Sequence, residues 1–270
     1  MKSRLVSNST ILSLAVVLLL VSSGMNAQTA TSAPKPISPE QRETIETVLR
    51  EYLLKNPAII REASQALQQQ EEREKQERAK AGLKTFNAEI YSDQDSPSVG
   101  NPKADVTVVV FFDYNCGYCK GTVPELEDLV KQDPALRLIY KEYPILGAQS
   151  LIAARAALAA HRQGKYAEFH RALMVAKEIN LASIRATSVR LGLDYLKLRQ
   201  DMDDPQVTEA LKRNLNLANS LEINGTPGYI VGNRLIPGAI DPAALAQLVR
   251  DERAKLTSPG NVGVVGSPGK

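Results

Sequence analysis

The chain has 270 residues, of which 43% are hydrophobic, and its formal net charge is +3 at neutral pH. This nearly balanced charge gives no electrostatic basis for binding nucleic acid or an anionic membrane surface. The length allows one sizeable domain with an appendage. Because the chain has only two cysteines, a scaffold of several structural disulfides is excluded.

The first residues have the pattern of a secretory signal. Lys2 and Arg4 precede an apolar run over 11–21, and small and polar residues follow. The run is too short to cross a bilayer comfortably, which favours a cleaved signal peptide over 1–27. An uncleaved anchor stays open as the alternative. Loss of the two basic residues would lower the formal charge from +3 to +1, and export predicts a periplasmic location.

A helical arm is predicted over 38–85. Residues 28–37, rich in Thr, Ala, Ser and Pro, predict a flexible leader before it. Ser38 can cap a helix whose first position is Pro39, and Gln41 completes a capping box.

The arm carries a narrow apolar stripe interrupted at Asn56-Pro57, where a second helix can begin. The stripe contains Ile45, Val48, Tyr52, Ile60, Ala63 and Leu67. No apolar residue occurs over 68–78, which predicts a solvated stalk. We therefore expect the arm to oligomerise. The alternative is a helical hairpin packed on the main domain.

A second domain is predicted over 86–256. It opens with a possible strand at 89–91 and a loop over 93–105. The nearly all-apolar run 106–112 predicts a central strand buried on both faces. A helix follows the cysteine pair, and 136–143 reads as the next strand.

A helical block interrupts this domain over about 150–222, with breaks that predict four or five short helices. The runs 229–231 and 234–236 flank Gly-Asn and predict a tight hairpin. Asp241 can cap a last helix, and the tail over 257–270 has a composition typical of disorder. The order of elements predicts an α/β thioredoxin-type sheet with an α-helical insertion, preceded by the helical arm.

The most informative feature is the pair Cys116 and Cys119, which follows the central strand and begins a helix. A C-x-x-C pair closes too short a loop to constrain the unfolded chain much, so it indicates a redox centre. The helix N-terminus favours a thiolate at Cys116. We expect Cys116 to be the exposed nucleophile and Cys119 to be the resolving thiol.

Two other interpretations of the pair are a structural disulfide and half of a zinc site. Zinc needs two more ligands, and the only histidines, His161 and His170, lie nine residues apart with no second cysteine pair. We therefore expect no metal and no cofactor.

Three motifs resemble the DsbA-like branch of the thioredoxin superfamily, and within it the secreted ScsC-like and Com1-like thiol:disulfide interchange proteins. They are Phe-Phe-Asp-Tyr-Asn-Cys-Gly-Tyr-Cys over 111–119, Tyr-Lys-Glu-Tyr-Pro-Ile-Leu-Gly over 140–147, and Gly-Thr-Pro over 225–227. The resemblance covers roughly 86–255, and the N-terminal arm is typical of ScsC-like members, which tend to trimerise.

The resemblance implies that four residues shape the site around the cysteines. They are Gly117, Tyr118, Thr226 and Pro227. A cis bond before Pro227 would turn the Thr226 backbone toward Cys116, and a trans proline in a turn is the alternative. Tyr118 can also be an ordinary surface aromatic. Many relatives carry a buried acid six residues before the first cysteine. Val110 stands there, which leaves Asp113 or Glu142 as candidate substitutes.

The sequence thus predicts a periplasmic thiol:disulfide oxidoreductase that acts on protein disulfides. Gly-Tyr between the cysteines and Thr before the proline resemble the isomerase DsbC, so we expect an isomerase or reductase. Such an enzyme needs a membrane electron donor of the DsbD or ScsB type. A DsbA-like oxidase served by a DsbB-type partner is the alternative, and a holdase chaperone or copper-handling protein is the alternative from another class.

Overall fold

The structure is a computed structural model that describes residues 37–257. The predicted signal peptide lies outside the described residues, as do nearly all of the leader and of the tail. The described residues fall into two compact units, 37–62 and 63–257. Each unit is considered by itself.

In the first unit the predicted helix start is confirmed. Helix α1 (Pro39–Lys55) is capped by Ser38, whose hydroxyl accepts the Gln41 N–H while the Gln41 side chain accepts the Ser38 N–H. Asn56 ends α1, and α2 (Ala58–Thr85) begins after Pro57. No residue of α1 is buried, so its apolar side chains face solvent.

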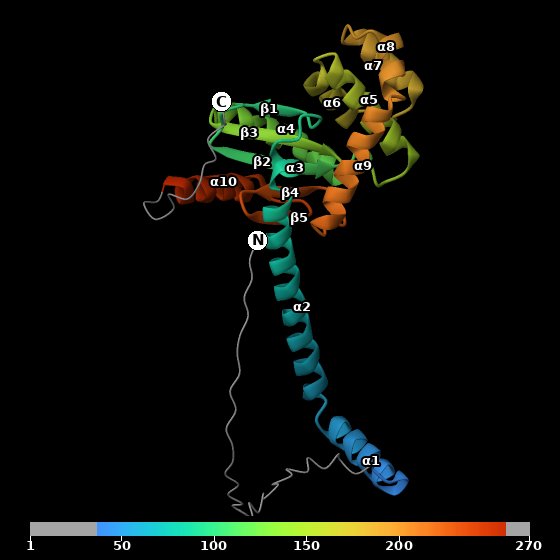
Figure 1. The fold of residues 1–270 in the computed structure, drawn as a ribbon, viewed down its shortest axis with the longest axis vertical. Coiled ribbons are helices and arrows are strands. Elements are labelled where there is room, and N and C mark those ends of the chain that lie inside the picture. The colour runs from blue at the N-terminus through green and yellow to red at the C-terminus, as the bar shows by residue number, and fades with distance from the viewer. Residues whose placement is uncertain (1–36, 258–270) are drawn as a thin grey trace, which may run out of the picture. The chain divides into compact units, whose positions relative to one another are not determined.

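The second unit is built around a five-stranded sheet in the order β1-β3-β2-β4-β5 (Figure 1). The strands are β1 (Ser98–Gly100), β2 (Val106–Phe112), β3 (Leu136–Glu142), β4 (Gly228–Val231) and β5 (Arg234–Pro237). Only β2 and β3 pair in parallel. The prediction that β2 is the central strand is confirmed, because it pairs with β3 on one side and with β4 on the other.

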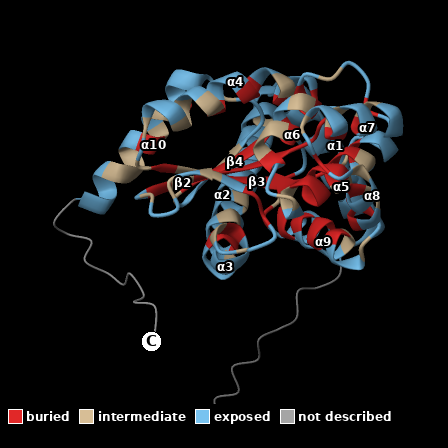
Figure 2. Ribbon diagram, turned by 90° about the horizontal axis from the view of Figure 1, so that it is seen from above, coloured by how far each residue is buried: buried red, intermediate tan, exposed pale blue. Residues whose placement is uncertain are grey.

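Helices cover both faces of this sheet, and the buried residues gather on its inner strands and on α5 (Figure 2). Val108, Val110 and Phe112 point into a core shared with α4 (Gly117–Gln132) and α10 (Pro242–Thr257). Val109 and Phe111 point into a second core with Leu83 at the end of α2. The alternation follows from the two-residue period of a strand.

The insertion consists of five helices, which confirms the upper predicted number. They are α5 (Ala148–Arg162), α6 (Tyr166–Met174), α7 (Leu181–Arg190), α8 (Tyr195–Met202) and α9 (Pro205–Ser220). Most alanines of α5 are buried against its neighbours. Small side chains there let the surrounding helices approach closely.

The strand expected at 89–91 is wrong. This segment is helix α3 (Asn87–Tyr91), in which the Ile90 N–H donates to the Phe86 carbonyl at 2.9 Å. Ile90 is fully buried in the second core, so burial and not sheet pairing explains its apolar side chain. The loop expected over 93–105 contains the short edge strand β1.

Candidate active site

The cysteine pair lies at the corner between β2 and α4. Cys116 is the N-cap of α4, with extended backbone, and its Sγ accepts the Cys119 N–H at 3.2 Å. A cap in this position satisfies one of the free N–H groups at the start of a helix. The sulfur therefore stands where the backbone amides favour negative charge.

Thr226 lies directly beside this sulfur. The Cys116 thiol donates to the Thr226 carbonyl, with 3.3 Å between Sγ and O. Pairing of β4 with β2, in which Gly228 faces Phe111, brings the two segments together across 110 residues. The Thr226–Pro227 bond is cis, as predicted.

The expectation of an exposed Cys116 is wrong. Its relative exposure is 5%, against 0% for Cys119, because the Thr226 carbonyl and the core around β2 cover it. Burial raises the pKa of the Cys119 thiol far above its ordinary value. Gly117 and Tyr118 between the two cysteines are exposed, and the Tyr118 side chain is 74% exposed.

Asp113 is a buried carboxylate that orders the loop before Cys116. Its oxygens accept the N–H groups of Asn115, Ile145 and Leu146 at 2.7, 2.8 and 2.9 Å. The Ser150 hydroxyl donates to it at 2.7 Å. Four donors make this carboxylate a fixed link between the end of β2, the segment after β3 and the start of α5.

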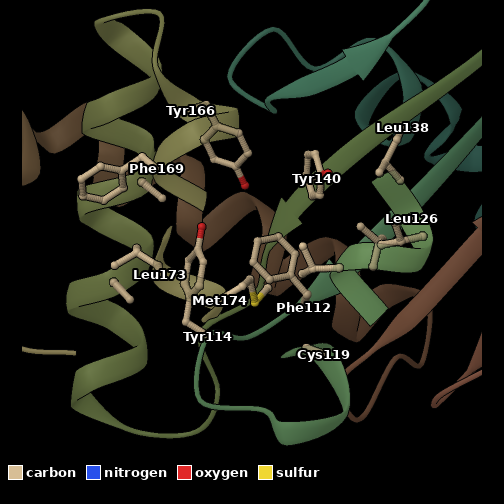
Figure 3. Close-up of a cluster of buried hydrophobic side chains, with 14 of the residues drawn as sticks. Phe112, Tyr114, Cys119, Leu126, Leu138, Tyr140, Tyr166, Phe169, Leu173 and Met174 are labelled. Atoms are coloured by element: carbon tan, nitrogen blue, oxygen red, sulfur yellow. The ribbon is translucent and has the colours of Figure 1, made fainter. Parts of the chain in front are cut away.

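A second buried carboxyl, Glu142, lies at the end of β3. Its Oε1 accepts the hydroxyls of Tyr114 at 3.0 Å and Tyr166 at 2.8 Å. Figure 3 shows these two hydroxyls directed into the same space. The Tyr114 hydroxyl also lies 3.0 Å from Nδ1 of His170 on α6. We call Tyr114, Glu142, Tyr166 and His170 the Glu142 cluster.

Burial sets the protonation of this cluster. Loss of water raises the pKa of Glu142 to about 8, even though both tyrosine hydroxyls lower it, and the charge of Asp113 raises it further. Burial lowers the pKa of His170 to about 3, with a smaller contribution from Arg171. At neutral pH the cluster therefore holds a protonated carboxyl and a neutral imidazole.

Both candidate substitutes for the acid missing at Val110 are thus buried, in different settings. Glu142 has a signal in the sequence, because Lys141-Glu142 is a charged pair that directly follows the apolar run Leu138–Tyr140 in β3. Its partners Tyr166 and His170 carried no such signal, since they belong to a helical block far along the chain. Within residues 37–257 no group of three or more His, Cys, Asp or Glu side chains is placed to hold a metal ion.

No helix between residues 37 and 257 is long and apolar enough to cross a membrane. Glycine at 117 is not required by space, because an added Cβ would meet nothing within 4 Å. Residue 117 is therefore free to vary sterically, and its side chain would face solvent.

Comparison with known proteins agrees with this geometry. Residues 107–250 match the DSBA-like thioredoxin domain, and residues 41–74 match the domain described as the copper resistance protein ScsC N-terminal domain. The chain belongs to the DSBA-like thioredoxin domain family. The prediction of a thioredoxin fold with a helical insertion is confirmed.

Two solved structures illustrate the relationship. A thioredoxin-like oxidoreductase from Silicibacter pomeroyi is 43% identical, with a TM-score of 0.60, over 63% of this chain and 98% of its own. A mutant of Proteus mirabilis ScsC is 28% identical, with a TM-score of 0.63, over 83% of this chain and 100% of its own. The resemblance to ScsC-like proteins is thereby confirmed.

Among curated proteins, the chain is 29% identical over 161 residues to a Na(+)/H(+) antiporter NhaA 3 from Salinispora tropica. The match covers 58% of this chain and 25% of the antiporter. The chain thus spans about a quarter of the length of the first curated relatives that it matches.

Proposed function

We propose that the protein is a thiol:disulfide oxidoreductase that isomerises or reduces disulfides of other proteins. The observation that carries this proposal is the position of the Cys116 sulfur at the N-cap of α4, 3.2 Å from the Cys119 nitrogen and 3.3 Å from the Thr226 oxygen. The sulfur has a donor that favours its thiolate and a partner thiol one helical turn away.

In the proposed reaction the Cys116 thiolate attacks one sulfur of a substrate disulfide. The substrate S–S bond breaks, a mixed disulfide with Cys116 forms, and the released substrate thiolate takes a proton. In isomerisation the freed substrate thiolate instead attacks another substrate disulfide, and the thiolate that this sets free attacks the substrate sulfur of the mixed disulfide, so that a new substrate disulfide forms and Cys116 leaves as a thiolate. In reduction Cys119 loses its proton and attacks Cys116, which releases a reduced substrate and leaves the Cys116–Cys119 pair oxidised.

The direction of electron flow distinguishes an isomerase or reductase from an oxidase. Thr226 and the Gly117-Tyr118 pair support the isomerase through their resemblance to DsbC. Alkylation of cells under acid quench traps the state of Cys116 and Cys119. A reduced pair is the expected result, and an oxidised pair would favour the DsbA-like oxidase.

Thr226→Val should shift the reduction potential, since residue 226 lies at the sulfur.

A reductase needs a source of electrons, and we propose a membrane donor of the DsbD or ScsB type. This partner fits a periplasmic protein exported by the signal at 1–27. Deletion of the donor should leave the cysteine pair oxidised in cells. A pair that stays reduced without any such donor contradicts the assignment.

We also propose that the helical arm over 38–85 assembles the protein into a trimer. Large apolar side chains of α1 are exposed, including Val48 at 60%, Leu49 at 54% and Tyr52 at 56%. Association would bury them, and several cysteine sites facing one misfolded substrate raise the effective thiol concentration. Sedimentation of the mature protein tests this, with Val48→Glu expected to give monomers and Arg50→Glu as the charge-changing control. A monomeric parent protein contradicts the proposal.

A second candidate function is that of a holdase chaperone or copper-handling protein. Residues 41–74 match the domain described as the copper resistance protein ScsC N-terminal domain, and this match supports copper handling. Replacement of both cysteines by serine separates it from the first. An oxidoreductase loses all turnover of disulfides, whereas a holdase keeps its suppression of aggregation. Copper affinity that survives the double replacement would point to a metal function independent of the thiols.

A further inference from the structure

A groove of about 360 Å³ begins at Thr226, next to the cysteine site. Residues 72–79 of α2 form one wall, the connection Glu222–Thr226 forms the floor, and the end of β5 forms the other wall. We call this the α2 groove. Because the Thr226 carbonyl also contacts Cys116 Sγ at 3.3 Å, a single residue separates the groove from the nucleophilic sulfur.

The α2 wall is fixed to the connection at two points. Arg78 forms an ion pair with Glu222, with 2.5 Å between Nε and Oε1. At Gly82 an added Cβ would meet Leu221 Cδ2 at 3.0 Å, so the absence of a side chain permits the close approach of the helix. These contacts lie on either side of Ala79. The wall therefore belongs to the same packed unit as the sheet and the cysteines.

The lining of the groove suits a polypeptide more than a small charged metabolite. Its apolar members include Ala79, Ile223 and Leu235, whereas Glu72 and Lys75 supply opposite charges on the helix side. Glu222, the third charged residue of the lining, forms an ion pair with Arg78, so the groove favours no net charge in its occupant. Apolar side chains of an unfolded segment find cover there, and the polar positions can meet its backbone groups. The volume lies within the usual range for ligand pockets.

We propose that the α2 groove binds an extended segment of an unfolded substrate polypeptide and thereby presents the neighbouring disulfide to Cys116. This inference rests on the proposed thiol:disulfide activity. It assigns substrate recognition to residues 72–79, a part of the chain that the cysteine chemistry alone does not involve. The continuity of the groove with Thr226 is what favours a substrate segment over other occupants.

The test fills the groove and compares two disulfides of different size. Ala79 is half-buried and lines the groove, whereas Ala81 is exposed two residues further along the same helix and does not line it. Ala79→Tyr is the test variant, Ala81→Tyr is the matched control, and both are made in the full chain. Gln76→Tyr, at an exposed groove position, serves if the first variant does not fold.

The probes are hydroxyethyl disulfide, which is too small to reach the groove while its sulfur is attacked, and a disulfide-containing peptide with apolar flanks. Ala79→Tyr should raise KM for the peptide by about tenfold and leave turnover of hydroxyethyl disulfide unchanged. Ala81→Tyr should leave both unchanged. Equal peptide KM values for the parent and the Ala79→Tyr and Gln76→Tyr variants overturn the proposal.

The outcomes also separate this inference from the function beneath it. If the parent protein reduces neither disulfide, the proposed function fails. If it reduces both and the groove variants slow only its re-reduction by a membrane donor, or only its self-association, then the groove binds that partner or a second copy and the inference fails. Loss of both activities in the groove variants, with the fold intact by circular dichroism, likewise overturns it.

Discussion

Asp113 follows β2, and Glu142 is the last residue of the neighbouring strand β3. Both carboxyls are buried close to the cysteine loop, yet their surroundings differ. Asp113 accepts four hydrogen bonds, three of them from backbone N–H groups. Glu142 accepts two, both from tyrosine hydroxyls. The two buried carboxyls therefore differ in the number and kind of donors that face them, and with only two hydroxyl donors burial still raises the pKa of Glu142.

Of the substitutions that test this comparison, Asp113→Asn should lower the free energy of unfolding most. The new amide nitrogen is a donor and would face N–H and O–H donors, so hydrogen bonds that Asp113 now accepts would be lost. We expect a loss of about 3 kcal/mol in the free energy of unfolding at neutral pH, measured by urea denaturation. Asp128→Asn, at an exposed carboxylate paired with Lys131, is the control and should change stability little. Equal losses of stability in Asp113→Asn and Asp128→Asn would show that the buried Asp113 carboxyl stabilises the fold no more than an exposed carboxylate does.

Glu142→Gln should remove a pH dependence. The folded-state pKa of about 8 exceeds the ordinary 4.5, so the folded protein holds this proton more tightly than the unfolded chain. The contribution of Glu142 to the free energy of unfolding is therefore complete below pH 4.5. This contribution falls by roughly 1 kcal/mol per pH unit as the pH rises to about 8.

The measurement is the unfolding free energy at several pH values between 5 and 8, in the window just given. Glu142→Gln should flatten the decline relative to the parent protein. Glu125→Gln, at an exposed position, should leave it unchanged. Parallel pH profiles for the parent protein and the Glu142→Gln variant would mean that Glu142 holds its proton no more tightly in the folded protein than in the unfolded chain.

Tyr166→Phe should have the smallest effect. It removes the hydroxyl that donates to Glu142 at 2.8 Å, which costs about 1 kcal/mol and moves the decline in stability to higher pH, because that hydroxyl lowers the pKa of Glu142. Tyr195→Phe, on α8 outside the Glu142 cluster, is the control. If stability declines over the same pH range in Tyr166→Phe as in the parent protein, the Tyr114 hydroxyl alone supports the Glu142 carboxyl.

Local patterns in the sequence predicted much of this fold. The apolar run of β2, the Gly-Asn turn of the hairpin and the Ser38 cap each act over a few residues, and each was found at or near its predicted place. The segment 89–91 misled, because three residues do not distinguish a short helix from a strand. The sequence did not predict the edge strand β1 for the same reason, because it also has only three residues.

The candidate site was predicted only in part. The cysteine pair is visible as a motif, and its proximity to Thr226 follows from the family resemblance. In the Glu142 cluster, Tyr114 lies 28 positions and Tyr166 lies 24 positions along the chain from Glu142. Tyr114 and His170 lie 56 positions apart. No periodicity within one element reports such a contact. The burial of Cys116 depends on the carbonyl of Thr226, 110 residues away.

The contribution of α6 to the Glu142 cluster has a consequence for modularity. An insertion that only decorated the sheet could be excised, and its ends rejoined, with little harm to the rest. Here excision would strip Glu142 of the Tyr166 hydroxyl and open His170's place beside Tyr114 to water. The helical insertion and the thioredoxin sheet thus share buried hydrogen bonds within one compact unit, and grafting either onto another relative would require carrying the tyrosines and the glutamate together.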